Sequence, residues 1–166
     1  MQKLFFGTDG ATDDKMQRFY KILNAAGLDA YLSDSMASVI WDKYIFISSI
    51  ATVTSYFDNS IGEIMADEKK WQLLNDLLEE VMSVATAKNI AFNPKVKEKA
   101  MARFAILPFE ATSSMHSDFR NKKPQNELEA LTGYVVNTAK RLGVDVSVFE
   151  RMYAGMRNKP CLPTGR

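Results

Sequence analysis

The sequence contains very little of the two residues that build disulfides and most metal sites. Its only cysteine is Cys161 and its only histidine is His116. A single cysteine excludes a disulfide within the chain, and one thiolate with one imidazole cannot form a zinc site of the usual kind. We therefore expect no metal, and a reducing, cytoplasmic setting is the simplest fit to this cysteine usage.

Neither sign of charge dominates the chain. Its 21 lysine and arginine residues are matched by 20 aspartate and glutamate residues, and the formal net charge is +1. Nucleic acids and anionic membranes recruit proteins largely through excess positive charge, so this balance argues against both as partners. The two basic runs, residues 95–99 and 120–123, also carry no interleaved aromatic residues.

Long uninterrupted apolar runs are absent as well. A membrane-spanning helix needs about 20 predominantly apolar residues. The most apolar stretch, residues 35–57, is interrupted by Asp42, Lys43 and several serines. Residues 1–6 lack the cationic segment and apolar run of a signal peptide. We expect neither a signal peptide nor a membrane span.

Glycine-rich phosphate motifs are the last absence. The sequence has no G-x-G-x-x-G and no G-x-x-x-x-G-K-[ST], so it does not encode a dinucleotide site or a P-loop of its own. What it does have is a hydrophobic fraction of 46% over 166 residues, enough to bury a sizeable core in one soluble domain.

Apolar residues recur with helical spacing along most of the chain. The pattern, with caps and stop signals at the expected places, predicts an all-α bundle of about six helices. A short apolar knot at 61–65 and one helical turn or more at 115–120 complete the prediction. The main helices are expected over residues 15–26, 35–57, 67–88, 94–106, 126–142 and 147–156.

The first residues follow a different pattern. Residues 1–6 and 28–32 read as short strands on either side of the first helix. Because two such strands do not make a stable sheet alone, we expect residues 1–33 to be a β-containing strip at the edge of something larger. Residues 34–156 are then the helical domain. Residues 157–166, with two prolines, a glycine and no periodicity, are expected to be a flexible tail.

A lysine interrupts the most apolar helix. Lys43 falls on one stripe with Met36, Ile40, Ile47 and Ile50, in a stretch predicted to be buried all round. A buried ammonium must be paired, face a wet cavity or have its pKa lowered by desolvation, and each is common where a lysine does chemistry. The spacing alone favours a simpler reading, in which the side chain reaches the surface past the core.

The other polar candidates have simple structural readings. Ser113 or Ser114 is suited to cap the following helix, and Glu127 lies where a helix dipole favours a carboxylate. Such a carboxylate would equally suit a buried ammonium. His116 has no nucleophile at a catalytic spacing and is predicted to lie at the surface or at a helix end. Lys123, with its lysine neighbour, forms a solvated turn that beside a cleft would attract an anion.

Four short motifs together resemble one family. The motifs W-D-K-Y-I-F, I-G-E-I, S-S-M-H-S-D-F and N-E-L-E-A-L-T-G-Y-V-V are similar to the C-terminal domain of ketopantoate reductases, over residues 4–156. This domain is a helical bundle shared with 6-phosphogluconate dehydrogenase-like enzymes. The resemblance implies an NADPH-dependent oxidoreductase that reduces ketopantoate in pantothenate biosynthesis, with substrate between a Rossmann domain and this helical half.

The same resemblance implies a set of site residues. Lys43 matches the catalytic lysine, which polarises the ketone and acts as general acid when hydride arrives. Ser114 matches the serine that binds the substrate carboxylate, and Asp118 the acidic residue of the same motif. Glu127 matches the glutamate near the lysine and the ligands, and is the expected partner of Lys43.

The sequence departs from the family pattern at three further positions. Ile47, Ala51 and Ile61 stand where better-known members carry asparagines that grip the substrate, so the resemblance leaves the particular 2-keto acid open. The spacing from the serine to the glutamate is one residue longer than usual, which makes Asn126 and Glu129 alternatives for the carboxylate role.

Partners and activity follow as expectations. The resemblance implies a homodimer and a missing N-terminal Rossmann domain that would bind NADPH, so this chain is expected to be inactive alone. The alternative is a non-catalytic helical module for dimerisation or protein interaction, which the amphipathic helices would support. That alternative gives no reason for a lysine in the most apolar stripe.

Overall fold

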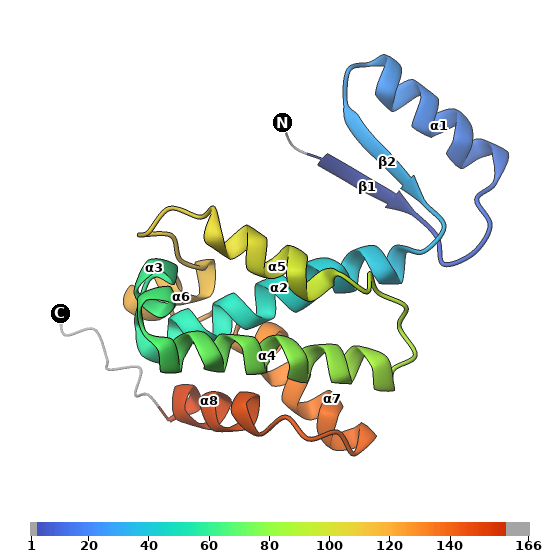
Figure 1. Cartoon of the computed structure of the whole chain (residues 1–166). Coiled ribbons are helices and arrows are strands. Elements are labelled where there is room, and N and C mark those ends of the chain that lie inside the picture. Colours follow the sequence, from blue (N-terminus) through green and yellow to red (C-terminus); the bar gives the residue numbers. More distant parts are fainter. Residues whose placement is uncertain (1–2, 159–166) are drawn as a thin grey trace.

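The structure is a computed structural model that describes residues 3–158. The all-α class is confirmed, and the two predicted strands are present (Figure 1). Most of the predicted tail, residues 159–166, lies outside the described residues, whereas Arg157 still belongs to the last helix. The helical elements of the bundle are α2 (Met36–Phe57), α3 (Ile61–Ala66), α4 (Glu68–Ala87), α5 (Val96–Ala105), α6 (Ser114–Arg120), η1 (Glu129–Gly133), α7 (Tyr134–Leu142) and α8 (Ser147–Arg157).

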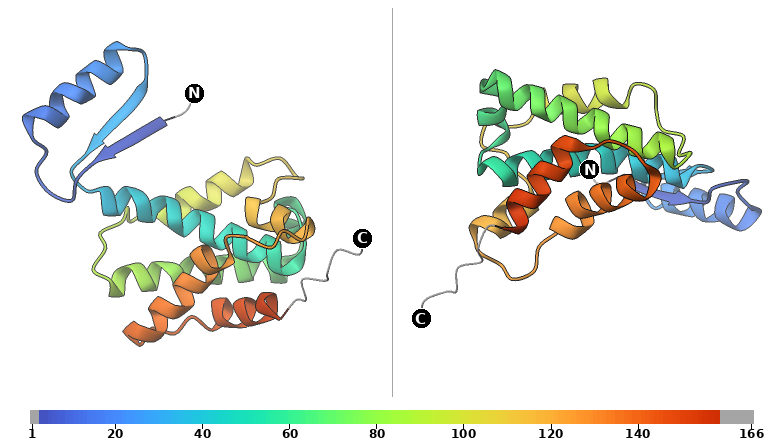
Figure 2. Two further views of the ribbon diagram at one scale, coloured as in Figure 1. Left: turned by 180° about the vertical axis from the view of Figure 1, so that it is seen from behind. Right: turned by 90° about the horizontal axis from the view of Figure 1, so that it is seen from below.

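The core of the bundle forms around α2. This helix runs through the middle of the molecule, with α4 beside it, α5 over its first half and α7 and α8 on the other side (Figures 1 and 2). Its residues Ile45 and Val53 are fully buried, as are Leu74 and Leu78 of α4 and Phe149 of α8. Apolar residues at helical spacing therefore meet in one contiguous core, as the periodicity predicted.

The second half of α2 buries several hydroxyl groups, and hydrogen bonds satisfy them. Ser48, Ser49 and Thr54 donate to the carbonyl oxygens of residues four positions earlier, at 2.7 to 2.9 Å. Thr52 and Thr132 of η1 join their hydroxyls across the core at 2.8 Å. By length and composition α2 could also cross a membrane, but half of the apolar window is buried in the fold, as in the core helix of a soluble protein.

The first half of α2 corrects the expectation of a helix buried all round. Ile40 is 56% exposed, and Lys43 is also exposed. Ile50 and Thr54, on the same stripe, are buried. The difference arises because the elements around the first turns, β1 and α5, leave a hollow there instead of closing over the helix.

Two elements differ from the sequence prediction. The apolar knot after α2 is the helix α3, begun by a capping box in which Ser60 and Glu63 each bond the other's backbone N–H. The helix predicted over 126–142 begins instead with η1, a π-helical segment of five residues, before α7. Tyr44 holds this segment by donating to the carbonyl oxygens of Ala130 and Leu131, each at 2.9 Å.

The N-terminal strip is a parallel β-α-β unit. Strands β1 (Lys3–Gly7) and β2 (Asp29–Ser33) pair in parallel, and α1 (Asp14–Ala25) makes the crossover. The unit extends from one end of the bundle in Figure 1 and in the left view of Figure 2. No residue of α1 is buried, and Phe19 and Ile22 are 51% and 63% exposed.

The strip is tied to the bundle at the start of α2. Asp9 accepts a hydrogen bond of 2.7 Å from the backbone N–H of Ala37, and the carbonyl oxygen of Thr8 accepts one of 3.0 Å from Met36. These bonds satisfy N–H groups that a helix start leaves without partners, while Ser35 makes no side-chain cap. The cap of the central helix is thus supplied from the β-α-β unit.

Candidate functional site

Lys43 lies on the wall of a hollow of about 400 Å³ between β1, α2 and α5. Apolar residues line the hollow, among them Phe5 of β1. Its charged lining consists of one carboxylate, Asp42, and three cationic side chains, Lys43, Lys99 and Arg103. Lys43 is exposed, as the reading in which its side chain reaches the surface past the core expects, and it reaches the surface at this hollow.

A second hollow of about 280 Å³ adjoins the first. The two share Phe46, Ile47 and Arg103, and the second is also lined by Ser114 and Glu127. Two segments far apart in the sequence thus bring the expected serine and glutamate beside the central helix. Lys43 and this pair lie on opposite sides of a shared wall.

Ser114 and Glu127 contact each other directly. The Oγ of Ser114 donates a hydrogen bond of 2.6 Å to Oε2 of Glu127, and both side chains are exposed at the hollow. The capping role falls to Ser113, whose Oγ accepts from the backbone N–H of His116 at 3.0 Å. Because Ser113 caps α6, the hydroxyl of Ser114 is left for the hollow.

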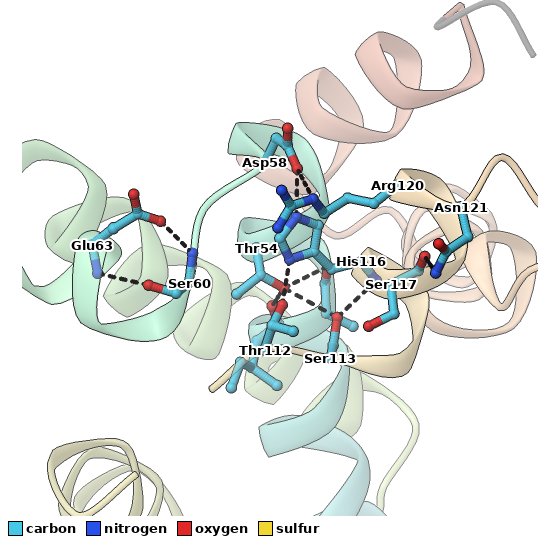
Figure 3. A network of polar contacts seen from close by, with 12 residues as sticks. Thr54, Asp58, Ser60, Glu63, Thr112, Ser113, His116, Ser117, Arg120 and Asn121 are labelled. Carbon is cyan, nitrogen blue, oxygen red and sulfur yellow. Dashed lines mark hydrogen bonds and ion pairs between the residues drawn. The ribbon is translucent and has the colours of Figure 1, made fainter. Parts of the chain in front are cut away.

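A polar network fixes the start of α6, and with it Ser114 (Figure 3). His116 lies in the first turn of α6, at a helix end as one of the two alternatives expected, and is only 2% exposed, so the surface alternative is wrong. Its Nε2 lies 2.6 Å from Oδ1 of Asp58, the residue that ends α2 with a φ of 53°, and its Nδ1 contacts Thr112. Ser113 and Thr54 join their hydroxyls at 3.1 Å. The network joins the end of α2 to the segment that positions Ser114.

The third residue of the expected set, Asp118, is not brought to either hollow. Its Oδ1 forms an ion pair of 2.7 Å with Nζ of Lys123. The lysine turn that would attract an anion is therefore tied, in part, to a neighbouring carboxylate. The substrate-binding role of Asp118 remains a prediction from the resemblance.

The expected pairing of Lys43 with Glu127 is absent from the part of the chain that the structure describes, because no ion pair within 4.0 Å joins them. The alternatives to Glu127 are occupied elsewhere. Glu129 accepts from the hydroxyl of Tyr153 at 2.7 and 2.8 Å. The side-chain oxygen of Asn126 accepts from the backbone N–H of Leu128 at 3.0 Å. Burial, together with the hydrogen bond to Glu129, raises the pKa of Tyr153.

Next to Lys43 along the helix, Tyr44 packs into the interior. Burial, with Tyr134 nearby, raises the pKa of Tyr44 well above its ordinary range, so its hydroxyl keeps its proton and donates to η1. Asp42, the other neighbour, accepts from the backbone N–H of Asn93 at 3.1 Å. Both neighbours of Lys43 thus serve the fold.

The three apolar replacements have different places. Ile47 lines both hollows and Ala51 lines the second, so the polar grip expected of related enzymes is replaced there by apolar wall. Ile61 is fully buried at the start of α3 and belongs to the core. Among the described residues, no group of three His, Cys, Asp or Glu side chains could hold a metal ion.

Two site residues were missed at the level of sequence. The run at 95–99 was predicted to be a solvated face, and Lys95, Glu98 and Lys99 are exposed. Lys99 also lines the first hollow, and Arg103, further along the helix, lines both. The signal was present, because Val96, Lys99 and Arg103 share one face of α5, and Val96 is buried. Helical periodicity alone could not show which helix this face would pack against.

The structure is a helical bundle attached to a β-α-β unit, with a lysine on one hollow and a serine–glutamate pair on the adjoining one. Residues 35–159 match the family model described as ketopantoate reductase PanE/ApbA C terminal. The chain belongs to this family.

Relatives outside the family model agree with this placement. The chain is 24% identical over 149 residues to a Bacillus subtilis protein named uncharacterized oxidoreductase YkpB, covering 90% of this chain and 49% of that protein. The chain therefore spans about half the length of the curated relatives it matches.

Solved structures share the fold. A PanE/ApbA family ketopantoate reductase from Ralstonia eutropha superposes with a TM-score of 0.81 at 21% identity, over 93% of this chain and 50% of that one. A ketopantoate reductase from Staphylococcus aureus, described as dimeric, gives 0.77 at 22% identity, over 87% and 50%. At these identities the likeness shows the fold alone.

Proposed function

We propose that this chain is the substrate-binding, lysine-bearing half of an NADPH-dependent reductase of 2-keto acids, with ketopantoate as the first substrate to test. The observation that carries the proposal is the position of Lys43, an ammonium on the wall of an open hollow beside a second hollow lined by Ser114 and Glu127. Membership of the oxidoreductase family supports the reaction class.

The residues of this chain supply binding and proton transfer in the proposed reaction. Reduction of a ketone builds negative charge on the carbonyl oxygen. An ammonium within hydrogen-bond reach stabilises that charge and then donates the proton, which assigns both roles to Lys43. Ser114 binds the substrate after turning its O–H from Glu127, which otherwise holds the serine side chain in place.

The hydride must come from outside the described residues. NADPH, when bound, supplies a hydride for the keto carbon, but this chain has no glycine-rich loop to hold its phosphates. The residues present fit the other side of the reaction, with the hollow of Lys43 opening beside β1. We assign the nucleotide to a Rossmann half that docks on the β-α-β unit, whose helix α1 is wholly unburied. We further propose a homodimer located in the cytoplasm.

The test is substitution of Lys43 in the enzyme assembled from this chain and its nucleotide-binding half. With Lys43→Ala, we expect kcat for ketopantoate and other accepted 2-keto acids to fall by roughly 10²- to 10⁴-fold, the usual contribution of a general acid. NADPH consumption measures the rate. Lys140→Ala, which removes an exposed lysine from α7, is the matched control and should change little. Rates within a few-fold of wild type for Lys43→Ala would reject the assignment.

A further inference from the structure

Arg103 occupies the junction of the two hollows. It lies near the end of α5 and, with Phe46 and Ile47, is part of the wall that both hollows share. Lys43 lies on one side of this junction, and Ser114 with Glu127 on the other. Arg103 is the cationic residue that the two linings have in common.

The guanidinium is held in place by aromatic packing. Its Cζ lies 4.3 Å from the centroid of the Phe46 ring, a cation–π contact. Phe46 in turn stacks on the fully buried ring of Phe104, with centroids 4.7 Å apart. The contact orients the side chain and uses none of its five N–H donors, so they remain available to a ligand.

No protein carboxylate claims this cation in the part of the chain that the structure describes. The ion pairs there join Lys70, Lys97, His116, Arg120 and Lys123 to acidic partners, and none includes Arg103 within 4.0 Å. On the same helix, Lys97 is paired with Glu79. Arg103 is therefore an oriented cation, lining a hollow, whose charge has no partner of opposite sign.

The serine cannot serve a carboxylate as it stands. The single O–H of Ser114 is donated to Glu127, so the hydroxyl presents only lone pairs to the hollow. A carboxylate accepts hydrogen bonds and offers none, so it needs a donor other than Ser114 in this arrangement. The nearest cationic donor in the lining of that hollow is Arg103.

We propose that Arg103 binds the carboxylate of the substrate through a pair of parallel N–H donors, and so selects 2-keto acids over neutral ketones. This proposal rests on the proposed function and adds the residue that recognises the acid group. With the carboxylate at Arg103, the keto oxygen is directed toward Lys43. The apolar wall made by Phe46, Ile47 and Ile50 then receives an apolar side chain of the substrate.

Anion binding to the 166-residue chain tests this assignment without any hydride donor. The probe is sodium 2-oxobutanoate, titrated while backbone amides of α5 are followed by NMR, and its methyl ester is the neutral analogue. We expect Arg103→Met to weaken binding of the acid by on the order of 10-fold or more, since a charge-assisted fork is lost, and to leave the ester unchanged. Arg103→Lys, which keeps the charge without the fork, should lie between.

Lys95→Met is the matched control, because it removes one exposed positive charge from the start of the same helix outside the hollow lining. It should bind the acid as wild type does. Three results would overturn the assignment: equal binding of the acid by Arg103→Met and wild type, no preference for acid over ester, or no saturable shift on α5. A purely packing role of Arg103 predicts a lower Tm with the preference for acid retained.

The two proposals fail in different ways. Loss of acid binding in Arg103→Met, together with no keto acid reduction by the assembled enzyme, would keep the anion site and reject the reductase. Reduction that depends on Lys43, with unchanged acid binding in Arg103→Met, would keep the reductase and reject the anion site at Arg103.

Discussion

The helical bundle and the β-α-β unit differ in how many of their apolar side chains are buried. In the bundle, α4 alone has six buried residues, Leu74, Leu77, Leu78, Val81, Val84 and Ala85. In the unit, α1 has none, although Phe19 and Ile22 are apolar. The bundle therefore holds its own core, whereas the unit leaves apolar surface that a further body would cover.

The comparison also separates two kinds of polar contact. Inside the bundle, His116, Thr54 and Ser113 form a shared network (Figure 3). Between unit and bundle, the connection rests on a few hydrogen bonds at the start of α2. Stability should accordingly reside in the bundle, and local opening in the unit.

The largest effect on stability is expected for Leu78→Ala, which is compared with a matched truncation in α1. Leu78→Ala in α4 removes a fully buried side chain and should lower the free energy of unfolding by about 2–5 kcal/mol. Ile22→Ala in α1 removes a side chain that is 63% exposed and should change it by less than about 0.5 kcal/mol. Urea titration followed by tryptophan fluorescence measures both, because Trp41 and Trp71 belong to the bundle.

This pair can also break the comparison. If Ile22→Ala destabilised the chain as much as Leu78→Ala, α1 would have to pack against something in the isolated chain, such as a second copy. Sedimentation of the wild-type chain would then show self-association. If Ile22→Ala leaves the urea transition of the bundle unchanged, the difference in stability between the two regions holds.

Sequence pattern located the bundle well because its signal is local. The spacing of Trp71, Leu74 and Leu78 sets the buried face of α4 whatever the partner is. The capping box of Ser60 and Glu63 was equally local and still missed. The π-helical form of η1 has no such signal, because it depends on Tyr44 reaching across from α2.

The site was harder to predict, since it depends on which faces are left uncovered. The apolar stripe of Lys43 suggested burial, but the hollow beside α5 exposes it. The resemblance paired Glu127 with Lys43, whereas the structure pairs it with Ser114. Arg103 was overlooked because a cation on an amphipathic helix is usually solvated. Arg103 is exposed, and only the packing of α5 on α2 shows that it also lines both hollows.

A smaller effect is expected at the joint between the regions. Asp9→Ala removes the side chain that accepts from the backbone N–H of Ala37 and should cost about 1 kcal/mol of stability, as for other helix caps. Asp9→Asn keeps an acceptor and should recover most of the loss. The same urea titration measures both, and hydrogen exchange should show faster opening at Ala37. Equal stability of Asp9→Ala and wild type would mean that the unit does not support α2.

The smallest effect is a pH dependence inside the bundle, at another carboxylate that caps a helix. Glu80 of α4 accepts from the backbone N–H groups of Val148 and Phe149 at the start of α8, at 2.8 and 2.9 Å. Burial raises the pKa of Glu80 above its ordinary value of 4.5, and outweighs these two bonds, which lower it. A carboxyl group with a raised pKa in the fold contributes stability below its unfolded pKa, and that contribution is lost as pH rises through the folded value.

Glu80→Gln keeps an acceptor oxygen and removes the titration. We therefore expect the stability of Glu80→Gln relative to wild type to increase as pH rises from 4 to 7, because only the wild type loses the contribution of Glu80. Urea titrations at several pH values measure this, with Glu98→Gln, an exposed carboxylate on α5, as the control. A relative stability that falls over the same range would mean that the bonds to α8 outweigh burial. The half-buried carboxylate of Glu80 would then stabilise the start of α8 in its ionised form.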